Sequence, residues 1–250
     1  DRLLADPGHG ERWARHWLDL VRYAETNGYE RDAIKPHAWR YRDYVIEALN
    51  ADKPYDRFLM EQLAGDELWP DDPDARIATA FNRHYPDESN ARNLVQRRQE
   101  ILNDVTDTVG YAFTGLSYAC ARCHDHKFDP ILQKDYYRLR AFLAPVQWRD
   151  DMTLATTAEK KAFAEQQTKW EAATAEIRAK MEALTKPLIE PKVERALTRF
   201  TDDLQVMTRK PADKRDALEK QLHQVSGELN QARVQAQAPS IATERTPARA

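Results

Sequence analysis

Both cysteines of the chain lie three positions apart, and a histidine directly follows the second. The segment CARCH, residues 120–124, lies within the stretch GLSYACARCHDHKFDP, residues 115–130. This spacing is typical of a c-type haem attachment site. Two thiols on one turn of backbone can bond the two vinyl groups of a porphyrin, and the imidazole that follows can ligate the iron. The motif therefore predicts covalent haem c on Cys120 and Cys123, with His124 as the proximal iron ligand.

Two other interpretations of the same residues stay open. The cysteine pair with His124 and His126 is compatible with zinc, which takes four nitrogen or sulfur ligands. The two thiols could instead form a redox dithiol or a structural disulfide. The zinc interpretation lacks a second ligand pair elsewhere in the sequence, and the dithiol interpretation lacks the alternating strands and helices of a thioredoxin-like domain. On spacing alone, haem ranks first, zinc second, and a dithiol or disulfide third.

Composition and charge indicate the class of protein. The 250 residues are 42% hydrophobic and 32% charged, with only 7 glycines, which is the balance of a soluble helical protein with enough apolar material for a core. The formal net charge of −3 gives no field that would attract nucleic acid or an anionic membrane. The sequence contains no run of about 18 apolar residues, so it predicts no membrane span.

Helical periodicity surrounds the motif on both sides. Apolar residues at steps of three and four predict helices over residues 11–23, 39–50, 55–64, 76–82, 91–118 and 134–144. The helix that starts at residue 91 is the longest, and it leads directly to Cys120. We therefore expect an all-α fold, with a c-type cytochrome-like helical domain over residues 1–150.

Three carboxylates lie on one stripe of the long helix that leads to the motif. They are Glu100, Asp104 and Asp107, at steps of four and three. We interpret this stripe as a solvated face. The alternative is that the carboxylates point inward and bond groups of a haem pocket or a cation.

Composition shifts after residue 150. From residue 157 to residue 238 the chain is rich in Ala, Glu, Lys and Gln, with almost no glycine. We expect long helices here, separated at Pro187, Pro191 and Pro211.

Two series of apolar residues in this region recur at steps of about seven, four and three. The first series is Phe163, Trp170, Ile177, Met181 and Leu184, and the second is Leu218, Leu222, Val225 and Leu229. They predict an antiparallel helical hairpin, a coiled-coil-like arm over residues 151–238. No residue type in this arm indicates chemistry, so it is interpreted as a spacer or docking arm. Residues 239–250 are predicted to be a disordered tail.

Longer phrases of the first half accompany the motif. They read GERWARHWLDLVRYAETNGYERD, AWRYRDYVIEALNADKPYDRFLMEQLAGDEL and GLSYACARCHDHKFDPILQKDYYRLRAFLA. Over about residues 1–146 the chain resembles the planctomycete-type cytochrome c domain family, specifically its second cytochrome-like domain. The resemblance implies a mostly helical domain that carries haem c within a large, exported, multidomain bacterial protein.

The family pattern matches this chain at Cys120 and Cys123 as thioether residues and at His124 as proximal ligand. Family members often have an Asn-Arg-x-His-like phrase before the long helix. The segment Asn82-Arg83-His84 resembles that phrase with one position fewer. The resemblance makes His84 the first candidate for a distal iron ligand or a pocket residue.

Three functions are compatible with these patterns. An electron-transfer or redox-sensing domain would hold a low-spin iron between His124 and a distal side chain. A haem enzyme would leave the distal position open and use His84, Tyr85 or His126 as proton donor to peroxide, oxygen or another substrate. A non-haem zinc or structural module is the third. The expected partners are a redox protein or neighbouring domains of the same polypeptide, and the arm offers a route to oligomerisation.

The haem interpretation also predicts where the protein resides. Haem thioethers are made outside the cytoplasm, so we expect a periplasmic or otherwise exported bacterial protein. The first residues, DRLLADPGHGERW, contain no apolar signal-peptide core. We therefore expect an export signal that has been cleaved or that lies outside this fragment.

Overall fold

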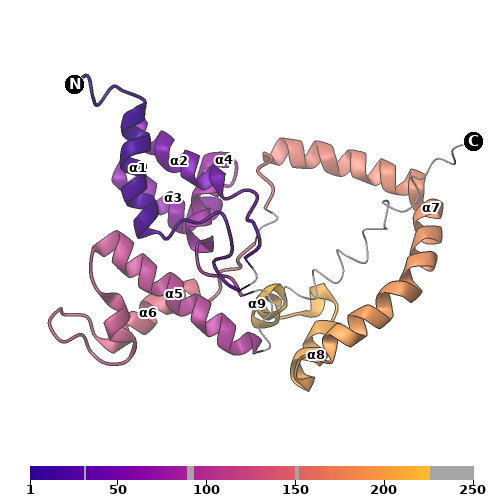
Figure 1. Ribbon diagram of the computed structural model, residues 1–250. Helices are drawn as coiled ribbons and strands as arrows, with labels where there is room; N and C mark the ends of the chain where they lie inside the picture. Colours follow the sequence, from indigo (N-terminus) through magenta and orange to yellow (C-terminus); the bar gives the residue numbers. More distant parts are fainter. Residues whose placement is uncertain (31, 89–92, 150–151, 226–250) are drawn as a thin grey trace, which may run out of the picture. The chain divides into compact units, whose positions relative to one another are not determined.

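The chain folds almost entirely into helices (Figure 1). The computed structural model describes residues 1–30, 32–88, 93–149 and 152–225. These residues contain no strand, and one isolated antiparallel bridge joins Thr26 to Ile34. The expected all-α fold is therefore confirmed. None of the helices in the described part combines the length and apolar character needed to cross a membrane.

The chain forms two compact units. The first contains residues 1–88 and 95–161, and the second contains the remaining described residues. The predicted tail, residues 239–250, lies outside the described residues.

The first unit begins with three packed helices. These are α1 (Gly8–Leu20), α2 (Trp39–Asn50) and α3 (Tyr55–Leu68). A glycine allows α1 and α2 to approach closely, because a Cβ at Gly10 would lie 2.5 Å from the backbone oxygen of Ile46. The N–H of Gly10 donates to the side chain of Asn50 at 2.8 Å. The backbone of α1 at Gly10 therefore lies directly against the backbone of α2 at Ile46, with no side chain between them.

Polar groups inside this helical layer are satisfied by one another. The Tyr41 hydroxyl, fully buried, donates to Gln62 Oε1 at 2.5 Å, and the Trp17 indole N–H donates to both oxygens at 3.0 Å. Glu61 accepts hydrogen bonds from Tyr44, Lys53 and Arg57 at 2.6–2.7 Å. Burial alone would raise the pKa of Glu61, but these three donors together lower it below its ordinary value.

The remaining elements of the first unit lead to the motif. They are α4 (Pro73–Ala78), the 3₁₀ helix η1 (Thr79–Arg83), α5 (Leu94–Thr114), the 3₁₀ helix η2 (Tyr118–Arg122) and α6 (Gln133–Leu143). The helix that we expected to reach residue 118 ends at Thr114. Gly115 follows with a φ of +68°, a left-handed conformation that ends helices and that glycine adopts at little cost.

The second unit follows as a long helix and short ones. Its elements are most of α7 (Thr157–Leu197), then α8 (Asp202–Arg209), the 3₁₀ helix η3 (Ala212–Lys214) and α9 (Ala217–Val225). Pro187 and Pro191 lie inside α7, so the expected helix breaks at these prolines are wrong. Both prolines are on an exposed part of α7, where water can bond the carbonyl groups that each proline leaves without an N–H partner.

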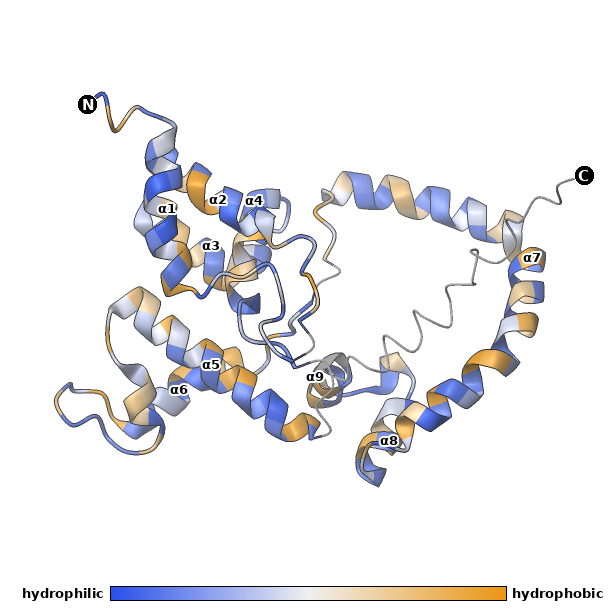
Figure 2. Cartoon of the chain, in the orientation of Figure 1, coloured by the Kyte–Doolittle hydropathy of each residue, from blue (hydrophilic) through white to orange (hydrophobic). Residues whose placement is uncertain are grey.

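The long helix of the predicted arm is present, but the hairpin seam is not buried. Every apolar residue of its first series is more than half exposed, and Figure 2 shows hydrophobic positions recurring along α7. The small core of the second unit instead gathers Leu94, Leu197, Phe200, Leu204, Met207 and Leu222. With 8 and 9 residues, α8 and α9 are too short to cover the 41 residues of α7. Leu229 of the second series lies outside the described residues.

Candidate functional site

The motif lies on a loop that projects from the paired helices α5 and α6 (Figure 1). Cys120 lies on the short helix η2, and Cys123 is the first residue after η2. Both thiols are exposed and free. The residue between them, Ala121, is fully buried in a cluster with Ile131 and Tyr136. This anchor fixes the backbone of the motif to the core and leaves the two thiols at the surface.

A second anchor joins the motif to α5. A Cβ at Gly110 would lie 2.5 Å from the Cβ of Tyr118, so the first residue of η2 packs directly on the backbone of α5. On the other side, the carbonyl oxygen of Arg122 accepts hydrogen bonds from Gln133 and Tyr137 of α6, both at 3.2 Å. The motif is therefore held between two helices, although its chemistry-bearing side chains are exposed.

His124 has one ring nitrogen engaged. Its Nδ1 lies 2.7 Å from the carbonyl oxygen of Asp125. A carbonyl oxygen can only accept, so Nδ1 carries the proton and Nε2 keeps its lone pair. An imidazole that donates from one nitrogen to a backbone carbonyl is the usual arrangement of a metal-ligating histidine, because this bond fixes the tautomer and makes the other nitrogen more basic.

His126 shapes the loop that follows. Its Nδ1 accepts hydrogen bonds from the backbone N–H groups of Phe128 and Asp129, at 3.2 Å and 2.8 Å. The proton of the neutral ring is therefore on Nε2, where it is available as a donor. This geometry is compatible with the predicted role of His126 as a proton donor, and it also gives this residue a structural role that its sequence position does not indicate.

Apolar side chains are exposed on the motif loop and on α6. Those more than a third exposed are Leu116, Phe128, Leu132, Tyr137 and Phe142. Phe128 is 83% exposed. A porphyrin has two large apolar faces, so a covalently attached haem is a group that such side chains could cover. With two free thiols and an unprotonated Nε2, the residues present fit haem c.

His84 and Tyr85, the other two candidates, lie in the core of the first unit. The ring of His84 is 4.6 Å from that of Tyr41 and 5.4 Å from that of Tyr23, centroid to centroid. Tyr85 is 3% exposed and packs edge-on against Trp148 at 5.8 Å. None of these ring contacts involves the motif loop. The structure thus brings Cys120, Cys123, His124 and His126 together on one loop, but not His84 or Tyr85.

Comparison with known protein families confirms the sequence resemblance in part, because it shows the domain family but not a cytochrome. A family model described as PSCyt2, protein of unknown function (DUF1549), matches residues 1–148. The chain belongs to the PSCyt2 family. The PSCyt2 match includes α1 to α6 and the whole motif loop, and it ends before α7. The description of PSCyt2 names neither haem nor an activity. No curated protein and no solved structure matches the chain.

The carboxylate stripe on α5 of the PSCyt2 domain is only partly a solvated face. Glu100 is exposed, as expected, and accepts a hydrogen bond from Gln96. Asp104 instead pairs with Arg22, and Asp107 lies 3.6 Å from Arg122 of the motif.

Burial raises the pKa of both of these carboxyls, although the nearby guanidinium groups act to lower it. The solvated interpretation is therefore wrong for Asp104 and Asp107. Arg22 lies 82 positions from Asp104 in the sequence, and Arg122 belongs to η2. The spacing of the carboxylates along α5 therefore could not reveal these partners.

No metal-ligand cluster is apparent in the described part of the chain. No group of three or more His, Cys, Asp and Glu side chains is placed to hold one metal ion there. The zinc interpretation of the motif needs four such ligands, and no set of them is placed together among the described residues.

His84 should make the PSCyt2 domain sensitive to acid. Burial, together with the charges of Lys35, Arg22 and Arg83, lowers the pKa of His84 from 6.5 to about 3. The unfolded chain therefore binds a proton here before the folded chain does. The contribution of His84 to stability is complete above pH 6.5 and is lost as the pH falls from 6.5 towards 3. Between pH 7 and 5.5 we expect a loss of about 1.3 kcal/mol.

The measurement is the free energy of unfolding in urea at both pH values, for the native chain and for His84→Phe. The variant should lack this part of the pH dependence. The same change at His37, which is exposed, should leave the dependence as it is. Equal pH dependences for the native chain and His84→Phe would contradict the prediction.

Proposed function

We propose that residues 1–148 form a domain that carries covalent haem c and transfers electrons within a larger exported bacterial protein. One observation carries the proposal. Two exposed, free thiols stand beside a histidine whose Nδ1 donates to the carbonyl oxygen of Asp125, which leaves Nε2 available for iron. The haem assignment also draws on the family resemblance of the sequence, and the match to PSCyt2, which is described without haem, covers the same residues.

Each residue of the motif has a defined part in this proposal. Cys120 and Cys123 form the thioether bonds, and the buried Ala121 between them keeps their spacing. His124 ligates the iron through Nε2, and the carbonyl group of Asp125 holds the ring in this orientation. Haem c bound here supplies reversible one-electron chemistry at its iron.

The surroundings of the motif would tune such a site. Arg122 lies between the two cysteines, and the carboxylate of Asp107 holds it from α5 at 3.6 Å. The charge of Arg122 favours the reduced state of a nearby redox centre, whereas the charge of Asp107 opposes it. Electron exchange would take place with a redox protein or with neighbouring domains of the same polypeptide.

The alternative proposal is a haem enzyme with an open distal position. His126, with its proton on Nε2, is the candidate proton donor that shares the motif loop. A side chain that ligates the iron from the distal side would give a low-spin iron instead. The predicted distal ligand, His84, is buried against Tyr23 and Tyr41 and does not share the motif loop. The spin state of the iron therefore separates electron transfer from the enzymatic alternative.

The proposal is tested by absorption spectra of the oxidised and reduced protein, produced in a host that matures c-type cytochromes. We expect one haem per chain, with the pyridine haemochrome bands of a porphyrin that has two thioether bonds. His124→Ala should lower the haem content strongly or convert the iron to a high-spin form, because the proximal ligand is lost. His37→Ala, a change at an exposed histidine of the same unit, should leave the spectrum unchanged. Bound zinc without iron would overturn the proposal.

A further inference from the structure

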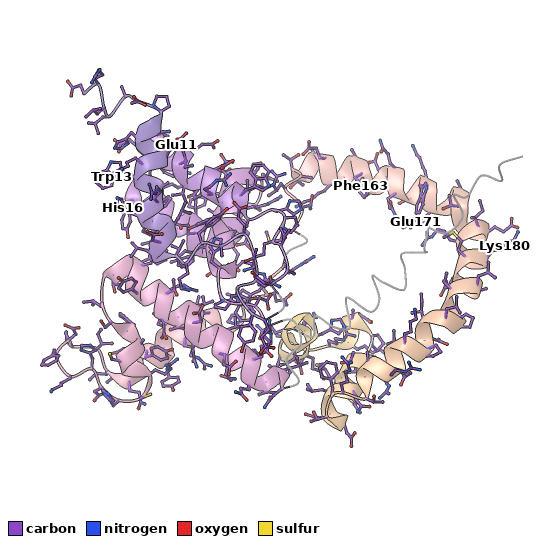
Figure 3. All side chains as sticks on the ribbon, in the orientation of Figure 1. Glu11, Trp13, His16, Phe163, Glu171 and Lys180 are labelled. Atoms are coloured by element: carbon purple, nitrogen blue, oxygen red, sulfur yellow. The ribbon has the colours of Figure 1, made fainter. Side chains whose placement is uncertain are left out.

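The helix α7 carries a stripe of large apolar side chains that nothing in the described part of the chain covers. Its large side chains are exposed as follows: Phe163 66%, Trp170 52%, Ile177 62%, Met181 58%, Leu184 73% and Leu188 69%. Figure 3 shows that side chains such as Phe163, Glu171 and Lys180 project freely from α7. An exposed apolar stripe of this size is typical of a surface that another molecule covers.

The spacing of the stripe is that of a coiled coil. Phe163, Trp170, Ile177 and Leu184 are seven residues apart, and Met181 and Leu188 each follow four residues after a member of this series. These are the two seam positions of a heptad repeat. From Phe163 to Leu188 the seam extends over roughly 38 Å at 1.5 Å per residue. Gln167 and Thr174 occupy the other seam positions, and polar residues at such positions fix the register of pairing.

The length of the seam limits what can cover it. The helices α8 and α9 have 8 and 9 residues, which is about a third of the seam. A second copy of α7 carries a seam of the same length, because the two helices have the same sequence. Pairing two copies through one shared surface needs twofold symmetry, which for two helices means either a parallel or an antiparallel arrangement.

The antiparallel arrangement pairs the stripe with itself. In one register Phe163 faces Leu188 of the second copy, and Trp170 faces Met181 of the second copy. Ile177 then faces Thr174 of the second copy. All of these layers arise from a single twofold axis near the middle of the seam, so each forms twice.

The same register also pairs charges along the edge of the seam. Glu171 faces Arg178 of the second copy, and the symmetry gives this contact twice. Arg178 already lies against the stripe, since its guanidinium group is 5.3 Å from the centre of the Trp170 ring. A parallel pair would instead place Glu171 near Gln166, which carries no charge. Charge complementarity therefore favours the antiparallel pair.

We propose that α7 pairs with α7 of a second copy as an antiparallel coiled coil, and that the chain is a dimer through this contact. Six large apolar side chains from each copy bring the interface to the order of the ~800 Å² per partner found in stable complexes. The proposed pair requires a straighter α7 than the curved helix of Figure 1. The proposal is independent of haem, because α7 lies outside the PSCyt2 match.

The test uses charge reversal in the full chain, with the dimer dissociation constant measured by sedimentation equilibrium at low salt. Glu171→Arg and Arg178→Glu should each weaken the dimer by about tenfold, because each change sets two like-charge contacts in place of two ion pairs. The double variant should return to within about threefold of the native constant, because the charges are exchanged.

Matched controls change the same charges on the outer face of the pair. Glu165→Arg and Lys169→Glu lie away from the seam in this register and should leave the dissociation constant unchanged. Circular dichroism should show equal helix content in all variants, since these side chains are exposed. A chain that is monomeric at every concentration would overturn the proposal, as would a double variant that is no tighter than the single ones.

Discussion

Replacing both motif cysteines by alanine should abolish covalent haem attachment completely. The thiols at Cys120 and Cys123 are the only two in the chain, so the double variant has no sulfur with which to form a thioether bond. The single variants Cys120→Ala and Cys123→Ala should attach haem through one bond at most, with a lower yield. The measurement is haem that stays with the polypeptide on a denaturing gel, detected by its peroxidase activity.

The control for this prediction is the helix content of each variant. Both thiols are exposed, and the core contact of the motif is made by Ala121, so the variants should keep the helix content of the native chain. Loss of haem with an intact fold would assign the attachment to these sulfurs. Equal haem retention by the double variant and the native chain would contradict the account.

The largest loss of stability from a single methyl group is expected at Gly65. A Cβ at this position would lie 2.1 Å from the backbone oxygen of Ala75 and 2.8 Å from its carbonyl carbon. These atoms belong to the backbone of α4, which cannot rotate away as a side chain would. Gly65→Ala should therefore push α3 and α4 apart and lower the free energy of unfolding by about 3 kcal/mol, even after the gain in helix propensity of about 1 kcal/mol.

Urea denaturation of the full chain measures this loss. Asp66→Ala is the matched control, because Asp66 is the next residue of α3 and is exposed. This control should stay within about 0.5 kcal/mol of the native chain. A Gly65→Ala variant that is as stable as the control would show that α3 and α4 do not approach as closely as described.

The helices of the first unit could be predicted from the sequence because each buries one periodic face. The apolar residues of α2 and α5 recur at helical spacing, and the structure buries Tyr41, Val45, Ile101 and Val105 accordingly. The end of α5 was harder to place. The apolar pattern continues past Thr114, whereas the left-handed conformation of Gly115 ends the helix.

The second unit shows where sequence patterns alone fail. A heptad seam indicates that a helix has a partner, but it does not identify the partner. The pattern of α7 predicts a hairpin within the chain, whereas the structure leaves the seam exposed. The predicted helix breaks at Pro187 and Pro191 are wrong for a related reason. An exposed helix tolerates a missing N–H more readily than a buried one.

At the site, the motif could be predicted from the sequence, but the residues that pack and pair around it could not. The spacing of the cysteines and His124 carries the chemistry, and the sequence contains it in five residues. The partner of Asp104 is Arg22, which lies 82 positions away, and only the fold brings the two together. The buried position of His84 also depends on packing, because a phrase that resembles a ligand motif does not reveal which rings surround it.

The most direct test of the account is the mass of the intact chain. Protein from a host that matures c-type cytochromes would be denatured, treated with a thiol-alkylating reagent and weighed by mass spectrometry. We predict the mass of the polypeptide plus one haem, with no alkyl group added at Cys120 or Cys123. A mass without haem and with two alkyl groups would contradict the central claim.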